Sequence, residues 1–314
     1  MALVNLVLDF NDTAPPSVIP TTSQVLSLLA SNPGIRCFEL QWLWVSDDGG
    51  NDSMSPVPLH HLERLSLEGS FHHVFPILRQ LELPKRIDNV TLNFSHCGLA
   101  EVRETVRSFI RDHLRRDSRF EDRLGVSTSS SAKWFTLQAC TIGVGPGLLP
   151  QNPPHVEFEM QLAESLSLEV HKGLFIDTLT HLPREGVVYL KTNLMVAEMV
   201  DILIKMPNIE HLYFFDMIIW KGFLLQGSGE TNMHQNLLPS LKRLYLENVQ
   251  TEDEDWGPLI TYLTHKASDN QAISLEVFGN RVHIRSDVLD QIYGLAKEMV
   301  YRPDPTIRCP FHRC

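Results

Sequence analysis

The chain has 314 residues, of which 43% are hydrophobic, and a formal net charge of −11 at pH 7. This length and apolar content suffice for a sizeable buried core. The negative charge argues against a general nucleic-acid or anionic-membrane binder, because both kinds of binding require a surplus of Lys and Arg. We therefore expect a protein partner with a basic or neutral surface.

The first ten residues, MALVNLVLDF, are apolar but lack a basic leader and include Asp9. They therefore do not match the pattern of a signal peptide. No run approaches the roughly 18 apolar residues that a membrane span requires. Five cysteines are scattered along the chain, which fits a reducing compartment better than a disulfide framework. We expect a soluble monomer in the cytoplasm or nucleus.

A short motif recurs along the chain, with a proline followed by apolar residues in the spacing Pro-x-Leu-x-x-Leu-x-Leu. Three copies share one frame: NPGIRCFEL at 32–40, MPNIEHLYF at 206–214 and LPSLKRLYL at 238–246. The motif prolines stand at positions 33, 58, 84, 183, 207 and 239, so successive gaps are 25, 26, 99, 24 and 32 residues. Because 99 is close to four units, the sequence predicts a repeat of about 25 residues.

Segments with helical periodicity lie between the motifs, with apolar residues at i, i+3, i+4 and i+7. They are residues 25–30, 74–81, 102–114, 196–206 and 256–263. A unit of one strand and one helix cannot bury its own apolar face, whereas stacked units share a core. We predict an α/β, irregular leucine-rich-repeat solenoid (horseshoe) of about nine strands. The parallel sheet would form its concave face and the helices its convex face, over residues 1–301, followed by a tail at 302–314.

Polar residues alternate with the apolar motif residues and should therefore face the concave side of the sheet. Such a rigid, extended surface suits protein recognition. We expect Tyr213 and Tyr245 to be its energetic hot spots, because tyrosine combines a large contact area with a hydrogen bond. The predicted binding residues are Glu39, Gln41, Arg64, Glu68, Asn93, His211, Tyr213, Arg243, Tyr245 and Glu247.

These loose repeats, with their irregular lengths and inserts such as GGNDS (49–53) and QGSGET (226–231), resemble the C-terminal repeat domains of fungal F-box proteins. The resemblance implies substrate recognition for a cullin-type ubiquitin ligase. In that family a separate F-box helix bundle binds the ligase adaptor. No Leu-Pro-x-Glu-Leu-Leu pattern occurs here, so we expect adaptor binding only if an F-box is supplied upstream. The alternative is a stand-alone leucine-rich-repeat scaffold without a link to a ligase.

The middle of the chain, about residues 117–186, breaks the period. A polar stretch (127–131), a strand-like run (133–141) and a Gly/Pro-rich loop (143–154) precede HVEFEMQLAESLSLEV, which alternates apolar and polar residues as strands do. We interpret this region as degenerate repeats decorated with a hairpin. An insert that grips a substrate is the alternative interpretation.

Chemical motifs are sparse. GVGPG at 143–147 is not followed by Lys-Ser or Lys-Thr, and no Gly-x-Ser-x-Gly, His-Glu-x-x-His or paired Cys-x-x-Cys occurs. We therefore predict no catalytic residues, no metal site and no cofactor, with a hydrolase hidden in 117–186 as the alternative. The terminal CPFHRC offers three soft ligands, Cys309, His312 and Cys314, but zinc usually takes four, so a loose tail is expected.

One predicted helix carries a stripe of four arginines. Arg103, Arg107, Arg111 and Arg115 are spaced at i, i+4 and share one side of the helix. Interleaved acidic residues favour a solvated convex face with weak local ion pairs. The alternative is docking of an acidic or phosphorylated partner, which the forked donors of arginine would suit.

Overall fold

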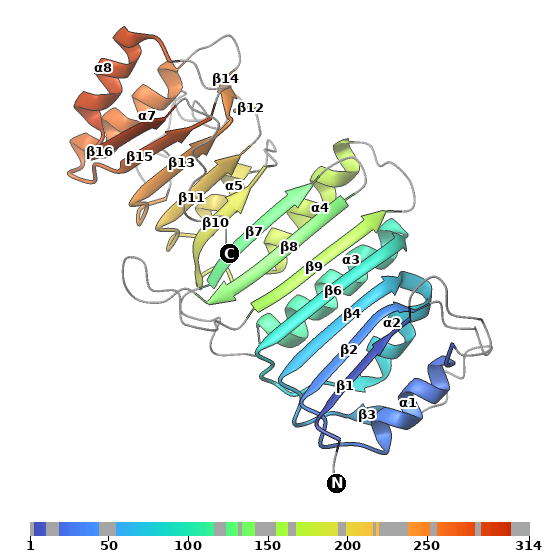
Figure 1. The fold of residues 1–314 in the computed structure, drawn as a ribbon. Coiled ribbons are helices and arrows are strands. Elements are labelled where there is room, and N and C mark those ends of the chain that lie inside the picture. The colour runs from blue at the N-terminus through green and yellow to red at the C-terminus, as the bar shows by residue number, and fades with distance from the viewer. Residues whose placement is uncertain are drawn as a thin grey trace. The chain divides into compact units, whose positions relative to one another are not determined.

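A computed structural model of the chain divides into two compact units (Figure 1). Unit 1 comprises Met1–Asp117, Ser130–Cys140 and Leu149–Leu168, and unit 2 comprises Ser118–Ser129, Thr141–Leu148 and Glu169–Cys314. The structure describes residues 3–10, 19–43, 55–115, 124–130, 134–141, 155–162, 168–193, 199–215, 218–219, 238–251, 256–279 and 284–302. Among these residues no helix is long and apolar enough to cross a membrane.

Unit 1 contains one main sheet. Its strands follow the order β1 (Asn5–Asp9), β2 (Cys37–Leu43), β4 (Arg64–Ser70), β6 (Asn89–Cys97), β9 (His155–Leu162) and β8 (Trp134–Thr141). Neighbouring strands are parallel except β8, which runs antiparallel to β9. The helices are α1 (Thr22–Ala30), α2 (Phe71–Gln80) and α3 (Leu99–Phe109), and α3 continues into a π-helical turn, η2 (Ile110–Leu114). Two short strands, β3 (Val57–Pro58) and β5 (Leu81–Glu82), pair separately.

Unit 2 is built around a second parallel arrangement. Its strands follow the order β7 (Leu124–Ser130), β10 (Val187–Thr192), β11 (His211–Phe215), β13 (Arg243–Glu247), β15 (Ser274–Phe278) and β16 (Glu298–Arg302). All five neighbouring pairs are parallel. The helices are α4 (Leu168–His181), α5 (Met199–Ile204), α7 (Gly257–Ser268) and α8 (Ser286–Leu295). A further short pair joins β12 (Ile218–Ile219) to β14 (Gln250–Thr251).

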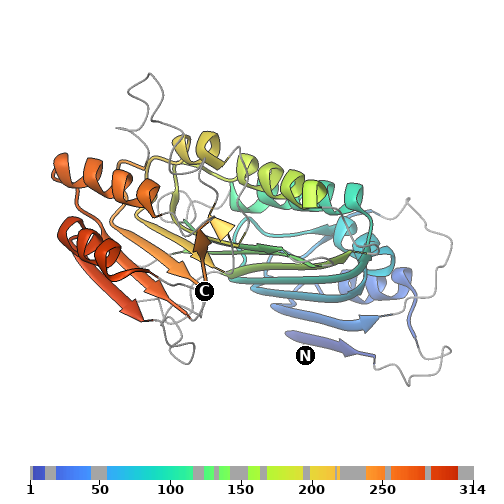
Figure 2. The ribbon, with the colours of Figure 1, turned by 90° about the horizontal axis from the view of Figure 1, so that it is seen from above.

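The repeated motif explains how the strands align. In unit 2, Leu212 lies opposite Leu244, and Phe214 lies opposite Leu246. In unit 1, Phe38 lies opposite Leu65 and Leu40 opposite Leu67 in the same way. All these side chains are buried. The helices of each unit lie on one face of its sheet (Figure 2), so the apolar motif residues are buried between the helices and the sheet. The predicted α/β class with parallel strands is therefore confirmed.

Local signals also match the observed helices. The Gln24 amide donates to Thr21 Oγ1 at 3.2 Å, and the Thr21 amide donates to Gln24 Oε1 at 2.9 Å, so a reciprocal capping box starts α1. The helices predicted at 25–30, 74–81 and 256–263 correspond to α1, α2 and α7, and 102–114 corresponds to α3 with η2.

The region 117–186 differs in part from its prediction. The strand-like runs at 133–141 and from 155 onward are confirmed as β8 and β9, and they form an antiparallel pair. Strand β9 ends at Leu162, however, and the expected alternation through 170 is wrong because α4 begins at Leu168. The polar stretch that follows Val126 belongs to β7, whose Leu124, Val126 and Thr128 are buried. The serines and threonine of β7 do not by themselves predict a strand, and β7 forms one because it pairs with β10.

Candidate functional site

The sheet of unit 1 has one face that no helix of the described residues covers (Figure 2). Residues opposite each other on neighbouring strands point to the same side of a sheet, so the register assigns the side chains of this face. Glu39 pairs with Ser66, Thr91 with Glu157, and Asn93 with Glu159. We call this surface the acidic face, and define it by Asp9, Glu39, Gln41, Arg64, Ser66, Glu68, Thr91, Asn93, Thr136, Gln138, Glu157 and Glu159.

The acidic face carries one sign of charge over most of its area. Within the described side chains, its carboxylates are Asp9, Glu39, Glu68, Glu157 and Glu159, and its one cation is Arg64. Asp9 and Arg64 are exposed, and the four glutamates are half-buried. Carboxylates held this way present oxygen acceptors to an incoming cation while the strands fix their positions.

Hydrogen bonds along the face orient several of these carboxylates. Asn93 Nδ2 donates to Glu68 Oε1 at 3.3 Å across the β4–β6 pair. Gln138 Nε2 donates to Glu157 Oε1 at 2.7 Å across β8 and β9. These bonds tie neighbouring strands together through side chains as well as through the backbone ladder, and they limit the rotamers that the carboxylates sample.

The electrostatics of Glu68 show how closely the acids influence one another. Burial raises the pKa of the Glu68 carboxyl, and the negative charges of Glu159 and Asp9 raise it further. Asp9, Glu68 and Glu159 come from β1, β4 and β9, so the face couples strands that lie far apart in the sequence. A cation placed among them would offset this repulsion.

The structure places the predicted binding residues of the first half of the chain on one surface. Glu39, Gln41, Arg64, Glu68 and Asn93 all belong to the acidic face. Their role in binding stays a prediction.

The predicted binding residues of the second half are less accessible than expected. His211, Tyr213, Arg243, Tyr245 and Glu247 lie on the side of the unit 2 sheet opposite Leu212, Leu244 and Leu246. Tyr213 and Tyr245 are only 1% exposed, so the expectation that they lie exposed on this surface is wrong, while their role in binding stays a prediction.

The physical reason is that aromatic side chains on adjacent strands cover one another. Tyr213 and Tyr245 have ring centroids 5.5 Å apart and form a buried cluster with Tyr189 and Phe278. Lys191 Nζ stands 4.8 Å from the centre of the Tyr213 ring.

Polar contacts on the same surface involve the remaining predicted residues. The Tyr213 hydroxyl donates to Glu247, and Arg243 Nη1 lies 3.7 Å from Glu276 Oε1. A hydrogen bond to Tyr245 raises the pKa of Arg243, and the charge of Glu276 acts in the same direction. These groups are engaged with one another within the unit, and therefore form a weaker candidate site than the acidic face.

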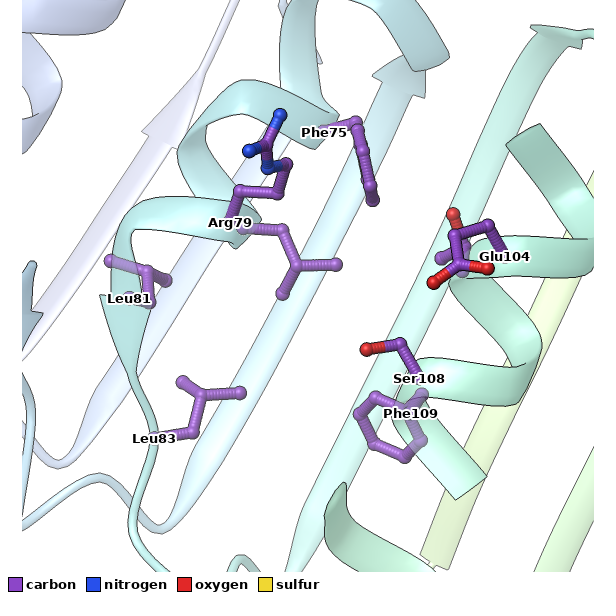
Figure 3. Close-up of a pocket in the computed structure, with 9 residues that line it drawn as sticks. Phe75, Arg79, Leu81, Leu83, Glu104, Ser108 and Phe109 are labelled. Atoms are coloured by element: carbon purple, nitrogen blue, oxygen red, sulfur yellow. The ribbon is translucent and has the colours of Figure 1, made fainter. Parts of the chain in front are cut away.

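A pocket of about 510 Å³ lies on the helix side of unit 1, between α2 and α3 (Figure 3). Figure 3 shows Phe75 and Arg79 facing Glu104, Ser108 and Phe109 across it. The complete lining is Phe75, Leu78, Arg79, Leu81, Leu83, Glu104, Thr105, Ser108 and Phe109. Thr105 Oγ1 donates to the Glu101 carbonyl at 2.8 Å, and Arg111 Nη2 donates to Ser108 Oγ at 3.1 Å, so both hydroxyls are already engaged. The pocket can admit an apolar side chain between its leucines and phenylalanines, and its acidic group is Glu104.

The arginine stripe lies on α3 and η2, on the helix side of unit 1, where the pocket also lies. Arg103 and Arg107 are half-buried, whereas Arg111 and Arg115 are exposed. The expected solvated face is therefore present only in the second half of the stripe.

Metal and thiol chemistry find no support among the described residues. No group of three or more His, Cys, Asp or Glu there could hold a metal ion, and Cys309, His312 and Cys314 lie outside the described part of the chain. Cys37, Cys97 and Cys140 are buried. Burial raises the pKa of Cys97 to about 12, which keeps its thiol protonated and unreactive at neutral pH.

Comparisons with protein-family models, with curated proteins and with solved structures give no match.

Sequence reasoning missed three carboxylates of the acidic face. Glu157 and Glu159 lie on β9, which enters the sheet out of the repeat frame, and Asp9 ends the first strand. The alternation in HVEFEMQL was the available signal for the two glutamates, because it places Glu157 and Glu159 on one side of a strand.

Proposed function

We propose that this chain is a non-enzymatic protein-protein interaction module that binds its partner through the acidic face of unit 1. The observation that carries this proposal is a sheet face that no helix of the described residues covers, whose polar side chains stand in register across six strands. We further propose that the strand–helix units form an irregular leucine-rich-repeat solenoid. The recurring proline motif and its aligned, buried apolar residues support that assignment.

The physical properties of the face favour binding. Its backbone is held by the ladder, and its four glutamates are half-buried, so binding costs little conformational entropy at these side chains. Its predominantly negative charge would speed the encounter with a basic protein and disfavour acidic ones. The same sign argues against nucleic acid as the partner.

We propose that the biological role is substrate recognition like that of the F-box proteins of cullin-type ubiquitin ligases, carried out by a monomer in the cytoplasm or nucleus. The support is the resemblance of the irregular repeats and their inserts to that family. Contact with the ligase adaptor would require an F-box joined upstream. A stand-alone repeat scaffold is the alternative, and it uses the same acidic face.

Affinity purification from the native cells, with quantitative mass spectrometry, tests the proposal. Three baits are compared: the wild-type chain, a Glu39→Lys/Glu68→Lys variant of the acidic face, and a Glu104→Lys control on the helix side of unit 1. We expect a partner that the face variant loses and the control keeps. A partner retained by the face variant would refute binding through this face.

The same purification separates the two roles. Adaptor and cullin recovered with the wild-type bait would support the ligase role. A face-dependent partner recovered without them would support the scaffold.

A further inference from the structure

We propose that the partner presents a basic segment in the polyproline II conformation, with Lys or Arg at every third residue, which crosses the strands of the acidic face. This inference rests on the proposed function and names the chemistry of its partner. Three features of unit 1 carry it: the sign of the charge, the spacing of the carboxylates, and the amide side chains between them.

The sign of the charge selects a cation. Of the described side chains on the face, five are carboxylates and one, Arg64, is basic. Glu68 is held near Glu159 and Asp9, both of which raise its pKa. A basic side chain between these groups replaces repulsion with attraction, which an acidic or neutral partner cannot do.

The spacing selects the conformation of the segment. Asp9 pairs with Gln41 on β2. Leu40 of β2 pairs with Leu67 of β4, and an irregularity between Leu40 and Leu43 follows, so Glu68 lies one strand beyond Gln41 without a direct partner on β2. Glu68 pairs with Asn93 on β6, which pairs with Glu159 on β9. Each carboxylate is thus separated from the next by one intervening strand. Two strand spacings of about 4.8 Å place consecutive carboxylates about 9.6 Å apart.

A polyproline II helix has a matching period. It completes one turn in three residues with a rise of about 3.1 Å per residue, so side chains at i, i+3 and i+6 project from one side about 9.3 Å apart. A β-strand repeats its sides at i and i+2, about 6.6 Å apart, and an α-helix brings i and i+7 to one side about 10.5 Å apart, so both match the carboxylate spacing less closely. Polyproline II therefore aligns three successive cations with Asp9, Glu68 and Glu159.

The residues between the carboxylates suit a peptide backbone. Gln41 and Asn93 occupy the two intervening strands, and both are half-buried amides that can donate and accept hydrogen bonds. A polyproline II segment makes no internal hydrogen bonds, so its carbonyl groups remain available to such donors. The same spacing disfavours a metal ion, because carboxylates about 9.6 Å apart cannot share one cation, and no metal-binding group is found among the described residues.

Fluorescence polarisation with two labelled peptides tests the proposal on the purified full chain. The first peptide contains four Lys-Pro-Pro units. The second has the same composition, with its four lysines consecutive. We expect the periodic peptide to bind at least about fivefold more tightly than the blocked one, and both to weaken as salt is raised. Equal affinities would overturn the proposal, since they would show attraction by net charge without recognition of the period.

Matched variants locate the site. Glu68→Gln/Glu159→Gln keeps the size of both side chains and one acceptor oxygen on each while removing the charge, and we expect it to weaken binding of the periodic peptide about tenfold. Glu104→Gln, on the helix side of the same unit, should bind as the wild type does. Urea denaturation of each variant checks that it is folded. Unchanged binding by the folded double variant would place the peptide elsewhere and overturn the proposal.

The outcomes also distinguish this inference from the proposed function. Equal affinities for the two peptides, together with a native partner whose capture depends on the acidic face, would refute the polyproline II segment but not the interaction module. Tighter binding of the periodic peptide, together with a native partner whose capture does not depend on the acidic face, would refute the proposed function instead.

Discussion

Glu68 shows how burial and neighbouring charges act on a single side chain of the acidic face. Its pKa in the folded protein is raised above the usual value of 4.5, first by burial and then by Glu159 and Asp9. The groups that face it are Asp9 from β1, Glu39 from β2, Arg64 from its own strand and Glu159 from β9. The folded protein therefore holds more protons than the unfolded chain between pH 4.5 and the raised pKa, so the free energy of unfolding falls as pH rises through that window.

This sign leads to a prediction for Glu68→Gln. The variant removes the charge but keeps an acceptor for Asn93, so we expect it to be more stable than the wild type by about 0.5 kcal/mol at pH 7, the usual scale for like charges on facing strands. The advantage should shrink as pH approaches 4.5. Urea denaturation at several pH values measures it, and a variant less stable than the wild type at pH 7 would contradict the assigned repulsion.

Two glycines make a matched pair at the same scale. Gly279 has φ of +100°, and a Cβ added there would lie 1.9 Å from Asn248 Oδ1 and 3.1 Å from its backbone nitrogen. Gly294 lies in α8, and nothing stands within 4 Å of its added Cβ.

We therefore expect opposite effects of alanine at these two positions. Gly279→Ala should lower the free energy of unfolding by about 2 kcal/mol, because alanine strains the backbone there and meets a neighbouring strand end. Gly294→Ala should raise it by about 0.5 kcal/mol, because alanine loses less entropy in a helix. Thermal or urea unfolding of both variants measures the two changes in the free energy of unfolding. Equal destabilisation by the two substitutions would contradict the expected difference between the positions.

At the scale of elements, Lys266 links a helix to a turn. It lies in α7 and is 4% exposed, and its Nζ donates to the Leu238 carbonyl at 2.9 Å and to Gln271 Oε1 at 3.3 Å. Burial lowers its pKa, while Asp269 acts in the opposite direction. The Leu238 carbonyl precedes β13, so this bond holds α7 against the start of a repeat strand.

Removing this link should destabilise unit 2. We expect Lys266→Ala to lower the free energy of unfolding by about 2 kcal/mol, because the substitution removes a buried, charge-assisted hydrogen bond to the Leu238 carbonyl, which keeps only its bond from the Leu241 amide. Lys297→Ala, at an exposed position before β16, is the control and should change stability by less than about 0.5 kcal/mol. A Lys266 variant as stable as the control would show that the bond contributes little.

Element prediction from sequence succeeded where periodicity was carried by apolar residues and failed where pairing decided the structure. The motif around Leu212 and Leu244 predicted two strands and their alignment, since Leu-x-Leu spacing matches the pleat. Strand β7 was missed because its serines and threonine carry no strand signal of their own. Helix α4 was misjudged because apolar residues in ESLSLEV fit either period over so short a run.

For the candidate site too, the sequence predicted which residues share a side of a strand, but not which strands are neighbours or which side chains are buried. Alternation placed Glu39, Glu68 and Asn93 on one side correctly, but the neighbours of β6 depend on the long connection to β9. In unit 2, HLYFF carries Tyr213 and Phe215 on the side opposite Leu212, whereas RLYLE carries Arg243 and Glu247 beside Tyr245 on that side. The sequence therefore did not signal the burial of Tyr245, which follows from its packing against Tyr213 on the neighbouring strand.

At the scale of the whole molecule, the net charge of −11 is consistent with the proposed function. The acidic face concentrates part of that charge on a rigid surface of unit 1, where it can steer and retain a basic partner. The helix side of the same unit provides the internal comparison, because Glu104 stands beside the pocket between α2 and α3.

Carboxyl-group footprinting tests the central claim most directly. The full chain, with and without its captured native partner, is labelled with a carbodiimide and an amine, and the modification of each Asp and Glu is quantified by mass spectrometry. We expect the partner to protect Asp9, Glu39, Glu68, Glu157 and Glu159, and to leave Glu104 on the helix side labelled as in the free chain. Protection of Glu104 with unchanged labelling of the acidic face would contradict the account.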